Sequence, residues 1–277
     1  TIALVRIQGL IAESMGGGPF GLGYESGVQS IIDQLERARK DSSVKAVVIR
    51  INSPGGSAAA SQEIYQAVKR VRGRKPVIVS MGDVAASGGY YVAAGADHIV
   101  ASPATLTGSI GVIMQTINFE ALMERYGVKA DTVTSGAYKD TGSMWRKMTE
   151  QERKYWQGMV DDVYEQFVGD VAAGRKDKGL SESQLRKLAD GRVFTGKQAL
   201  ENKLVDELGG LRTAIEAAKT RAGIKEAHLR ELRRKTFFEE VMGAQSGSRA
   251  DLVWRMLQYE RANPARHLLE APLTPIE

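Results

Sequence analysis

The chain has 277 residues, of which 43% are hydrophobic and 26% are charged, and its formal net charge is +5. These values are ordinary for a globular protein, and the length suits one large α/β core or one core with a small appendage. The chain has no cysteine, which excludes thiol catalysis, disulfide bonds and cysteine-bound metals, and it has no run of about 20 apolar residues that could span a membrane.

Strand-like and helix-like segments alternate along the chain. The strand-like runs are 2–7, 44–51, 77–81, 98–101 and 130–134. The helix-like runs are 28–40, 58–71, 87–94, 119–126, 149–173, 182–189, 196–201 and 211–221. Near-continuous apolar strands separated by amphipathic helices predict an α/β fold with a mainly parallel sheet covered by helices.

Two stretches interrupt this alternation. The glycine-rich residues 16–23 predict a loop. After a first, larger domain over 1–222, we expect a C-terminal extension over 223–277, with amphipathic helices at 226–240 and 251–261 and an extended, proline-containing end at 262–277. The two helices can pack on a neighbouring subunit, contact a membrane surface or pack on their own domain.

Ser87 is the candidate nucleophile. It stands among small residues in MGDVAASGGYY (81–91), just after an apolar run. A serine between small residues, where a strand ends and a helix begins, can present its hydroxyl to a bound carbonyl group. Such a serine needs a base, and none of the three histidines has surroundings typical of a catalytic triad.

Lys139, in SGAYKDTGS (135–143), is the best candidate for that base. A lysine amine can take a proton only when burial or a like charge favours its neutral form. The small residues around Lys139 permit such burial. Most lysines are solvated surface charges, so Lys139 taken alone would be weak support.

Taken together, these segments resemble a known family. The motifs are NSPGG (52–56), MGDVAASGGYY (81–91), TLTGSIGV (105–112), SGAYKDTGS (135–143) and DGRVFTGKQALENKLVDELGG (190–210). In content and order they resemble the signal peptide peptidase A family of Ser/Lys proteases, of the bacterial single-domain type, over about residues 1–218. The resemblance implies the fold of the Clp protease and crotonase superfamily, a superhelix of strand–strand–helix units.

The resemblance also implies roles for single residues. Neutral Lys139 would accept the proton of Ser87, and Ser109 would orient the lysine amine. The backbone N–H groups of Gly56 and Gly88 would bind the oxyanion, a role that suits a proline-glycine turn. Three apolar residues of these motifs either line a substrate groove or belong to the core, namely Val84, Ala85 and Ile110.

The substrates and partners follow from the resemblance as well. It implies cleavage of signal-peptide remnants at a bacterial cell membrane, by a catalytic domain on the extracytoplasmic side. An anchor would lie upstream of Thr1, outside the given chain. We expect a homo-oligomer, with an octamer as first choice, in which neighbouring subunits complete each site. We expect no metal, cofactor or nucleic acid.

Three other functions are compatible with parts of this pattern. A crotonase-like acyl-CoA enzyme would share the superhelix without using Ser87 and Lys139. A non-catalytic oligomeric scaffold would keep the fold and lose the pair. A Clp-type peptidase would use His98 as its base, although His98 lies close to Ser87 in the sequence and more often such a histidine is structural.

Overall fold

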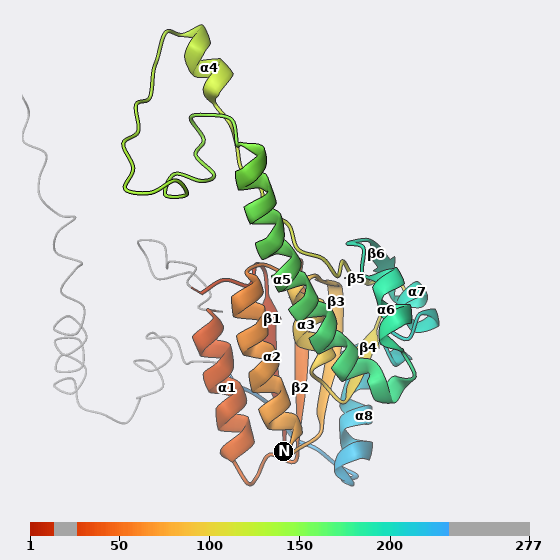
Figure 1. The fold of residues 1–277 in the computed structure, drawn as a ribbon. Helices are drawn as coiled ribbons and strands as arrows, with labels where there is room; N and C mark the ends of the chain where they lie inside the picture. The colour runs from red at the N-terminus through yellow and green to blue at the C-terminus, as the bar shows by residue number, and fades with distance from the viewer. Residues whose placement is uncertain (14–26, 233–277) are drawn as a thin grey trace, which may run out of the picture. The chain divides into compact units, whose positions relative to one another are not determined.

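The computed structural model describes residues 1–13 and 27–232, all within one compact unit, Thr1–Leu232. Its centre is an eight-stranded sheet with the order β6-β5-β3-β2-β1-β8, in which β4 pairs with β3 and β7 (Figure 1). Every described strand pair is parallel except β5 with β6. The strands are β1 (Ile2–Gln8), β2 (Ala46–Ser53), β3 (Val77–Ala86), β4 (His98–Ala101), β5 (Leu106–Gly108), β6 (Val193–Thr195), β7 (Glu207–Leu208) and β8 (Leu229–Glu231).

Helices cover both faces of the sheet. On β2, Val47, Ile49 and Ile51 join the larger core, while Ala46 and Val48 join a smaller core on the opposite face. Burial on both faces explains why β2 reads as a continuous apolar run rather than an alternating one. Each fully buried aliphatic side chain of this kind contributes about 1.5–3 kcal/mol.

The helices follow local signals in the sequence. In α1, four residues at helical spacing are buried, namely Val28, Ile31, Leu35 and Ala38. None of the described helices is both long and apolar enough to cross a membrane. The helices are α1 (Val28–Lys40), α2 (Ala58–Arg72), α3 (Gly88–Ala94), α4 (Glu120–Arg125), α5 (Glu150–Arg175), α6 (Glu182–Leu188), α7 (Gly196–Glu201) and α8 (Leu211–Ala222), with a 3-10 turn, η1, at Lys176–Lys178.

The α/β class and the covered, mainly parallel sheet are confirmed. Two predicted elements are wrong. Residues 130–134 form no strand, because they are exposed and pair with no sheet edge. Part of the helix predicted over 226–240 is instead β8, which pairs with β1 in parallel, so an available sheet edge outweighed the helical spacing.

The unit therefore continues past the boundary predicted at residue 222, because β8 belongs to the sheet. The predicted loop at 16–23, helix at 251–261 and extended end at 262–277 lie outside the described residues.

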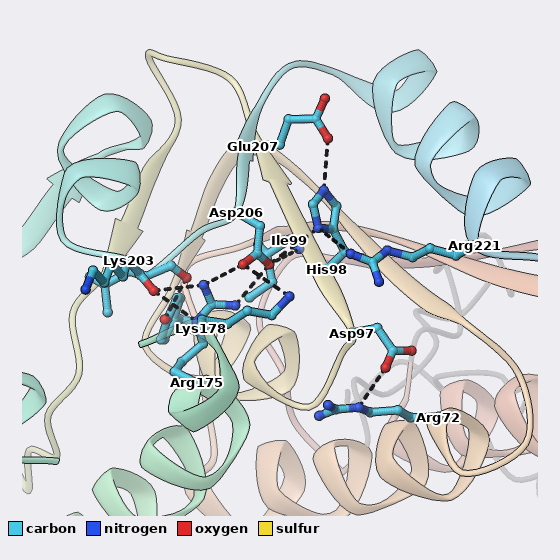
Figure 2. Close-up of polar contacts among 12 residues, drawn as sticks. Arg72, Asp97, His98, Ile99, Arg175, Lys178, Lys203, Asp206, Glu207 and Arg221 are labelled. Carbon is cyan, nitrogen blue, oxygen red and sulfur yellow. Dashed lines mark hydrogen bonds and ion pairs between the residues drawn. The ribbon is translucent and has the colours of Figure 1, made fainter. Parts of the chain in front are cut away.

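A buried ion pair fixes the C-terminal end of α5 (Figure 2). Arg175, which is 1% exposed, donates to both carboxylate oxygens of Asp206 at 3.0 and 2.8 Å and to the carbonyl oxygen of Lys203. Asp206 also accepts the N–H of Ile99 at 2.7 Å and lies 3.5 Å from Lys178. Burial acts to raise the pKa of Asp206, but the Arg175 guanidinium, the Ile99 N–H and Lys178 together outweigh it and hold that pKa below the ordinary value. The pair ties α5 to β4 and to the turn before β7.

Replacing Arg175 with Met should lower the free energy of unfolding by about 3 kcal/mol, because Asp206 would remain buried without its main partner. Denaturant unfolding followed by circular dichroism measures this loss. The double variant Arg175→Met with Asp206→Leu is the matched control and should recover part of the stability. An equal or greater loss of unfolding free energy in the double variant would show that the unpaired Asp206 carboxylate is not the cause of the loss.

Candidate active site

Ser87 occupies a strained turn between β3 and α3. Its φ and ψ are 51° and −119°, values that a residue with a side chain rarely adopts. Such a conformation costs about 1–3 kcal/mol and persists only where the surrounding structure imposes it. The Ser87 N–H donates to the carbonyl of Gly108 at 2.8 Å, and its carbonyl accepts the N–H of Tyr91 at 2.9 Å. Ser87 stays partly exposed between buried Ala86 and buried Gly88, which is the presentation that a serine nucleophile requires.

The NSPGG turn packs directly against this serine. A Cβ atom on Gly55 would lie 2.8 Å from both the Ser87 Cβ and the Gly88 nitrogen. A Cβ atom on Gly88 would lie 2.2 Å from the Ser61 Oγ and 3.3 Å from the Gly56 nitrogen. Only glycine allows the two backbone segments to approach so closely.

Ile11 holds the same turn from the other side. Its N–H donates to the Gly55 carbonyl, and its carbonyl accepts the N–H of Ser57, both at 2.8 Å. Within the described residues, the N–H groups of Gly56 and Gly88 donate to no protein acceptor. Two unpaired N–H groups beside a serine can together stabilise a developing oxyanion.

Ser109 follows β5 as Ser87 follows β3. Ala86 pairs with Gly108 in parallel register, so the two serines come next to each other at the ends of neighbouring strands. Ser109 also has a positive φ, 51°, and its N–H donates to the carbonyl of Arg192 at 2.8 Å. Among the described residues other than glycine, only Ser87, Ser109 and Lys203 have positive φ.

The three predicted substrate-binding residues differ in exposure. Ala85 and Ile110 are fully buried and belong to the larger core. Val84 is partly exposed, and its N–H donates to the side-chain oxygen of Asn52 at 3.1 Å. Of the three, only Val84 therefore offers side-chain surface in this chain.

Lys139 is not in contact with Ser87. Most side chains over residues 113–139 are exposed, and this segment contacts the N-terminal half of α5 (Figure 1). The Lys139 N–H donates to the Gly136 carbonyl at 3.0 Å. Its side chain is exposed and has no hydrogen bond or ion pair within the described residues. The structure thus brings Ser87, Gly56, Gly88 and Ser109 together, and it makes no contact between this group and Lys139.

His98 is excluded as the base for Ser87 of the same chain. Its Nε2 lies 2.9 Å from Glu207, and its Nδ1 lies 3.2 Å from the Arg221 guanidinium (Figure 2). His98 pairs with Ile78 near the start of β3, whereas Ser87 follows the end of that ten-residue strand. Because a register shift shortens β3 between Met81 and Ala85, about seven regular steps of 3.3 Å lie between the two positions, so the two residues are more than about 20 Å apart.

The chain is similar to proteins of a known peptidase family. The model of peptidase family S49 matches residues 69–225, a range that contains Ser87, Ser109 and Lys139. The chain belongs to peptidase family S49. A protein of Synechocystis sp. named as a protease is 42% identical and aligns over 80% of this chain and 75% of its own length.

In two further relatives of this S49 chain, the aligned region covers less than two thirds of the relative's own length. A protein of Enterococcus faecium named as the signal peptide peptidase SppA is 38% identical over 75% of this chain and 60% of its own length. The chloroplastic serine protease SPPA of Arabidopsis thaliana is 37% identical over 80% of this chain and 32% of its own length. Membership in S49 makes the chain a serine peptidase rather than a crotonase-like acyl-CoA enzyme.

The polar residues that hold the Lys139 segment were not among the predicted site residues. These are Asp140, Arg146 and Glu152, which join the segment to α5. One sequence feature could have pointed to Glu152. Thr149 and Glu152 have the spacing of a capping box that begins a helix.

Replacing Gly55 with Ala should lower kcat/KM for peptide hydrolysis by about 100-fold, because the added Cβ would displace Ser87 or the Gly88 N–H from its position. Gly158→Ala in α5 is the matched control, since nothing lies within 4 Å of its added Cβ, and it should leave activity unchanged. Steady-state kinetics on a short fluorogenic peptide measures both variants. Full activity of Gly55→Ala would show that this turn does not support the reaction.

Proposed function

We propose that this S49 peptidase hydrolyses peptide bonds with a Ser87 and Lys139 dyad. The observation that carries the proposal is the positive-φ Ser87 beside two N–H groups, of Gly56 and Gly88, that have no acceptor within the described residues. This arrangement matches what acyl transfer needs, a presented hydroxyl and a preorganised oxyanion site.

The reaction proceeds through an acyl-enzyme. Neutral Lys139 accepts the Ser87 proton while Ser87 Oγ bonds to the substrate carbonyl carbon, and the oxyanion binds the two N–H groups. The lysinium then protonates the leaving amine as the peptide C–N bond breaks. Water attacks the ester, again giving its proton to Lys139. The ester C–O bond then breaks, the lysinium returns the proton to Ser87 Oγ, and the acid product leaves. Ser109 hydrogen-bonds the lysine amine in its productive position.

We propose that Lys139 reaches Ser87 of a neighbouring subunit. Ser87 and Lys139 have no contact within the described chain, and exposed apolar side chains surround the lysine segment. Ile113 is 88% exposed and Val133 is 100% exposed, with Ile117, Tyr126 and Trp145 also exposed. A concentration of exposed apolar side chains of this kind marks a protein interface. Burial there would also favour the neutral lysine that the mechanism needs. We expect a homo-oligomer, with an octamer as first choice.

The proposed substrates are signal-peptide remnants and other peptides with small or apolar side chains beside the scissile bond. The name of the Enterococcus relative, a signal peptide peptidase, supports this class. We propose that this protein is anchored in a bacterial membrane with its catalytic domain on the extracytoplasmic side. There it would meet such peptides where they are left after secretion.

Ser87→Ala and Lys139→Ala should each reduce kcat by at least about 1,000-fold, because each removes one half of the dyad. Co-assembly of the two inactive proteins should restore part of the activity, since some sites would then combine an intact serine with an intact lysine.

Undiminished activity in Lys139→Ala would remove the proposed base. Inactive single variants that gain nothing from co-assembly would contradict the shared site and place the dyad within one chain. No activity in any form, the unaltered protein included, would favour the non-catalytic scaffold.

A further inference from the structure

The residues on either side of Lys139 are both attached to the start of α5. The Tyr138 ring packs on the Tyr155 ring with centroids 5.0 Å apart, and the Tyr138 hydroxyl accepts a hydrogen bond from Gln151 at 2.7 Å. On the other side, Asp140 forms an ion pair with Arg146. The lysine therefore lies in a turn whose position depends on α5.

Arg146 connects this turn to the helix through two bidentate contacts. Its Nε and Nη2 each donate to one carboxylate oxygen of Asp140 at 2.8 Å. Its Nη1 and Nη2 donate to the Glu152 carboxylate at 2.9 and 2.5 Å. A guanidinium that is bidentate to two carboxylates restricts orientation as well as distance. We call these three residues the Asp140–Arg146–Glu152 clamp.

Glu152 provides a fixed point for the clamp. The residue is 4% exposed, and its carboxylate also accepts the N–H of Thr149 at 2.8 Å, which completes the capping box of α5. Hydrogen bonding from Arg146 lowers the pKa of Glu152 to about 2 and also lowers the pKa of Asp140. Both groups have lowered pKa values, so their stabilising effect is complete above the ordinary carboxylate range and is lost as the pH falls through the lowered pKa of each group. The clamp therefore remains charged at the neutral and alkaline pH at which a lysine base would work.

The lysine amine itself lacks any such support. Within the described residues, Lys139 Nζ has no hydrogen bond, and Arg146 contacts the residue after the lysine rather than the lysine side chain. The direction in which the turn presents the amine is then set by how Tyr138 and Asp140 are held.

We propose that Arg146 is a positioning residue for Lys139. By binding Asp140 to Glu152, it fixes the turn that presents the amine to Ser87. This inference rests on the proposed function, in which Lys139 is the base. Effective proton transfer demands a near-attack geometry, and a displacement of about 1 Å can reduce a rate by about 100-fold. A solvated, freely moving lysine turn would lose that geometry.

The absence of cysteine from the chain permits a direct test of order at position 139. A nitroxide attached to Lys139→Cys reports nanosecond motion through its electron paramagnetic resonance spectrum, without requiring catalysis. We expect a motionally restricted spectrum when Arg146 is present and a sharper, more mobile one with Arg146→Ala. A spectrum that does not change with Arg146→Ala would overturn the proposal.

Arg186 provides the matched control. It too bridges two carboxylates, Glu165 at 2.7 Å and Glu182 at 2.8 Å, but it joins α5 to α6 away from Lys139. Arg186→Ala removes an equivalent double ion pair and should leave the nitroxide spectrum and the peptidase activity unchanged. A change in the spectrum equal to that of Arg146→Ala would assign the effect to general loosening of α5 and overturn the proposal.

Steady-state kinetics on proteins that retain Lys139 tests whether the loss of Arg146 lowers kcat. Arg146→Ala should lower kcat by about 10- to 100-fold with little change in KM, because peptide binding takes place beside Ser87. Asp140→Ala, which leaves the Arg146–Glu152 contact in place, should lower kcat similarly, and the double variant should lose no more than either single one. Thermal unfolding confirms that each variant folds.

The outcomes separate this proposal from the proposed function. If Lys139→Ala is inactive but Arg146→Ala keeps full kcat, the dyad stands and the positioning role falls. If Lys139→Ala stays active, the dyad falls, and Arg146→Ala can then still sharpen the spectrum without any effect on kcat; that result also rejects a positioning role in catalysis.

Discussion

The candidate active site depends on one backbone constraint, the positive φ of Ser87. That conformation turns the chain from β3 into α3 within a single residue, leaving the serine partly exposed between buried neighbours. The hydrogen bond from Ser87 to Gly108 and the close packing of Gly55 hold the strained residue in place. Because β5 runs parallel to β3 and ends level with it, Ser109 lies beside Ser87, and it too has a positive φ. The register of β3 with β5 and the packing of Gly55 therefore both stabilise the strained conformation of Ser87.

A second constraint is α5, which links the sheet to the turn that contains Lys139. It has 26 residues, a length of about 39 Å. The buried Arg175–Asp206 pair fastens its C-terminal end to the sheet, and the Asp140–Arg146–Glu152 clamp fastens the lysine turn to its N-terminal end. A long helix fixed in this way holds the Lys139 turn out of contact with the serine of the same chain.

Much of the architecture could be predicted from patterns with a clear physical origin. Buried strands such as β2 are apolar throughout, and helices such as α1 have one apolar face, so both were visible without tertiary information. The bounds of α1, α7 and β4 agree with the predicted ones. The short strands β5 to β8 were not found, because two or three residues are too few to show a period. In β8, pairing with the edge of β1 prevailed over a helical spacing.

The sequence by itself determined the chemistry available, since the small residues around Ser87 and the lysine in SGAYKDTGS are local features of the chain. Only the tertiary structure decided how these parts meet. Parallel register brought Ser109 beside Ser87, and the Ile11 bridge set the NSPGG turn against the serine. The length of β3 separated His98 from Ser87, although they lie close together in the sequence. Ion pairs with α5 placed Lys139 in its own exposed segment. Such relations join residues distant in the sequence through pairing and packing, and no local pattern encodes them.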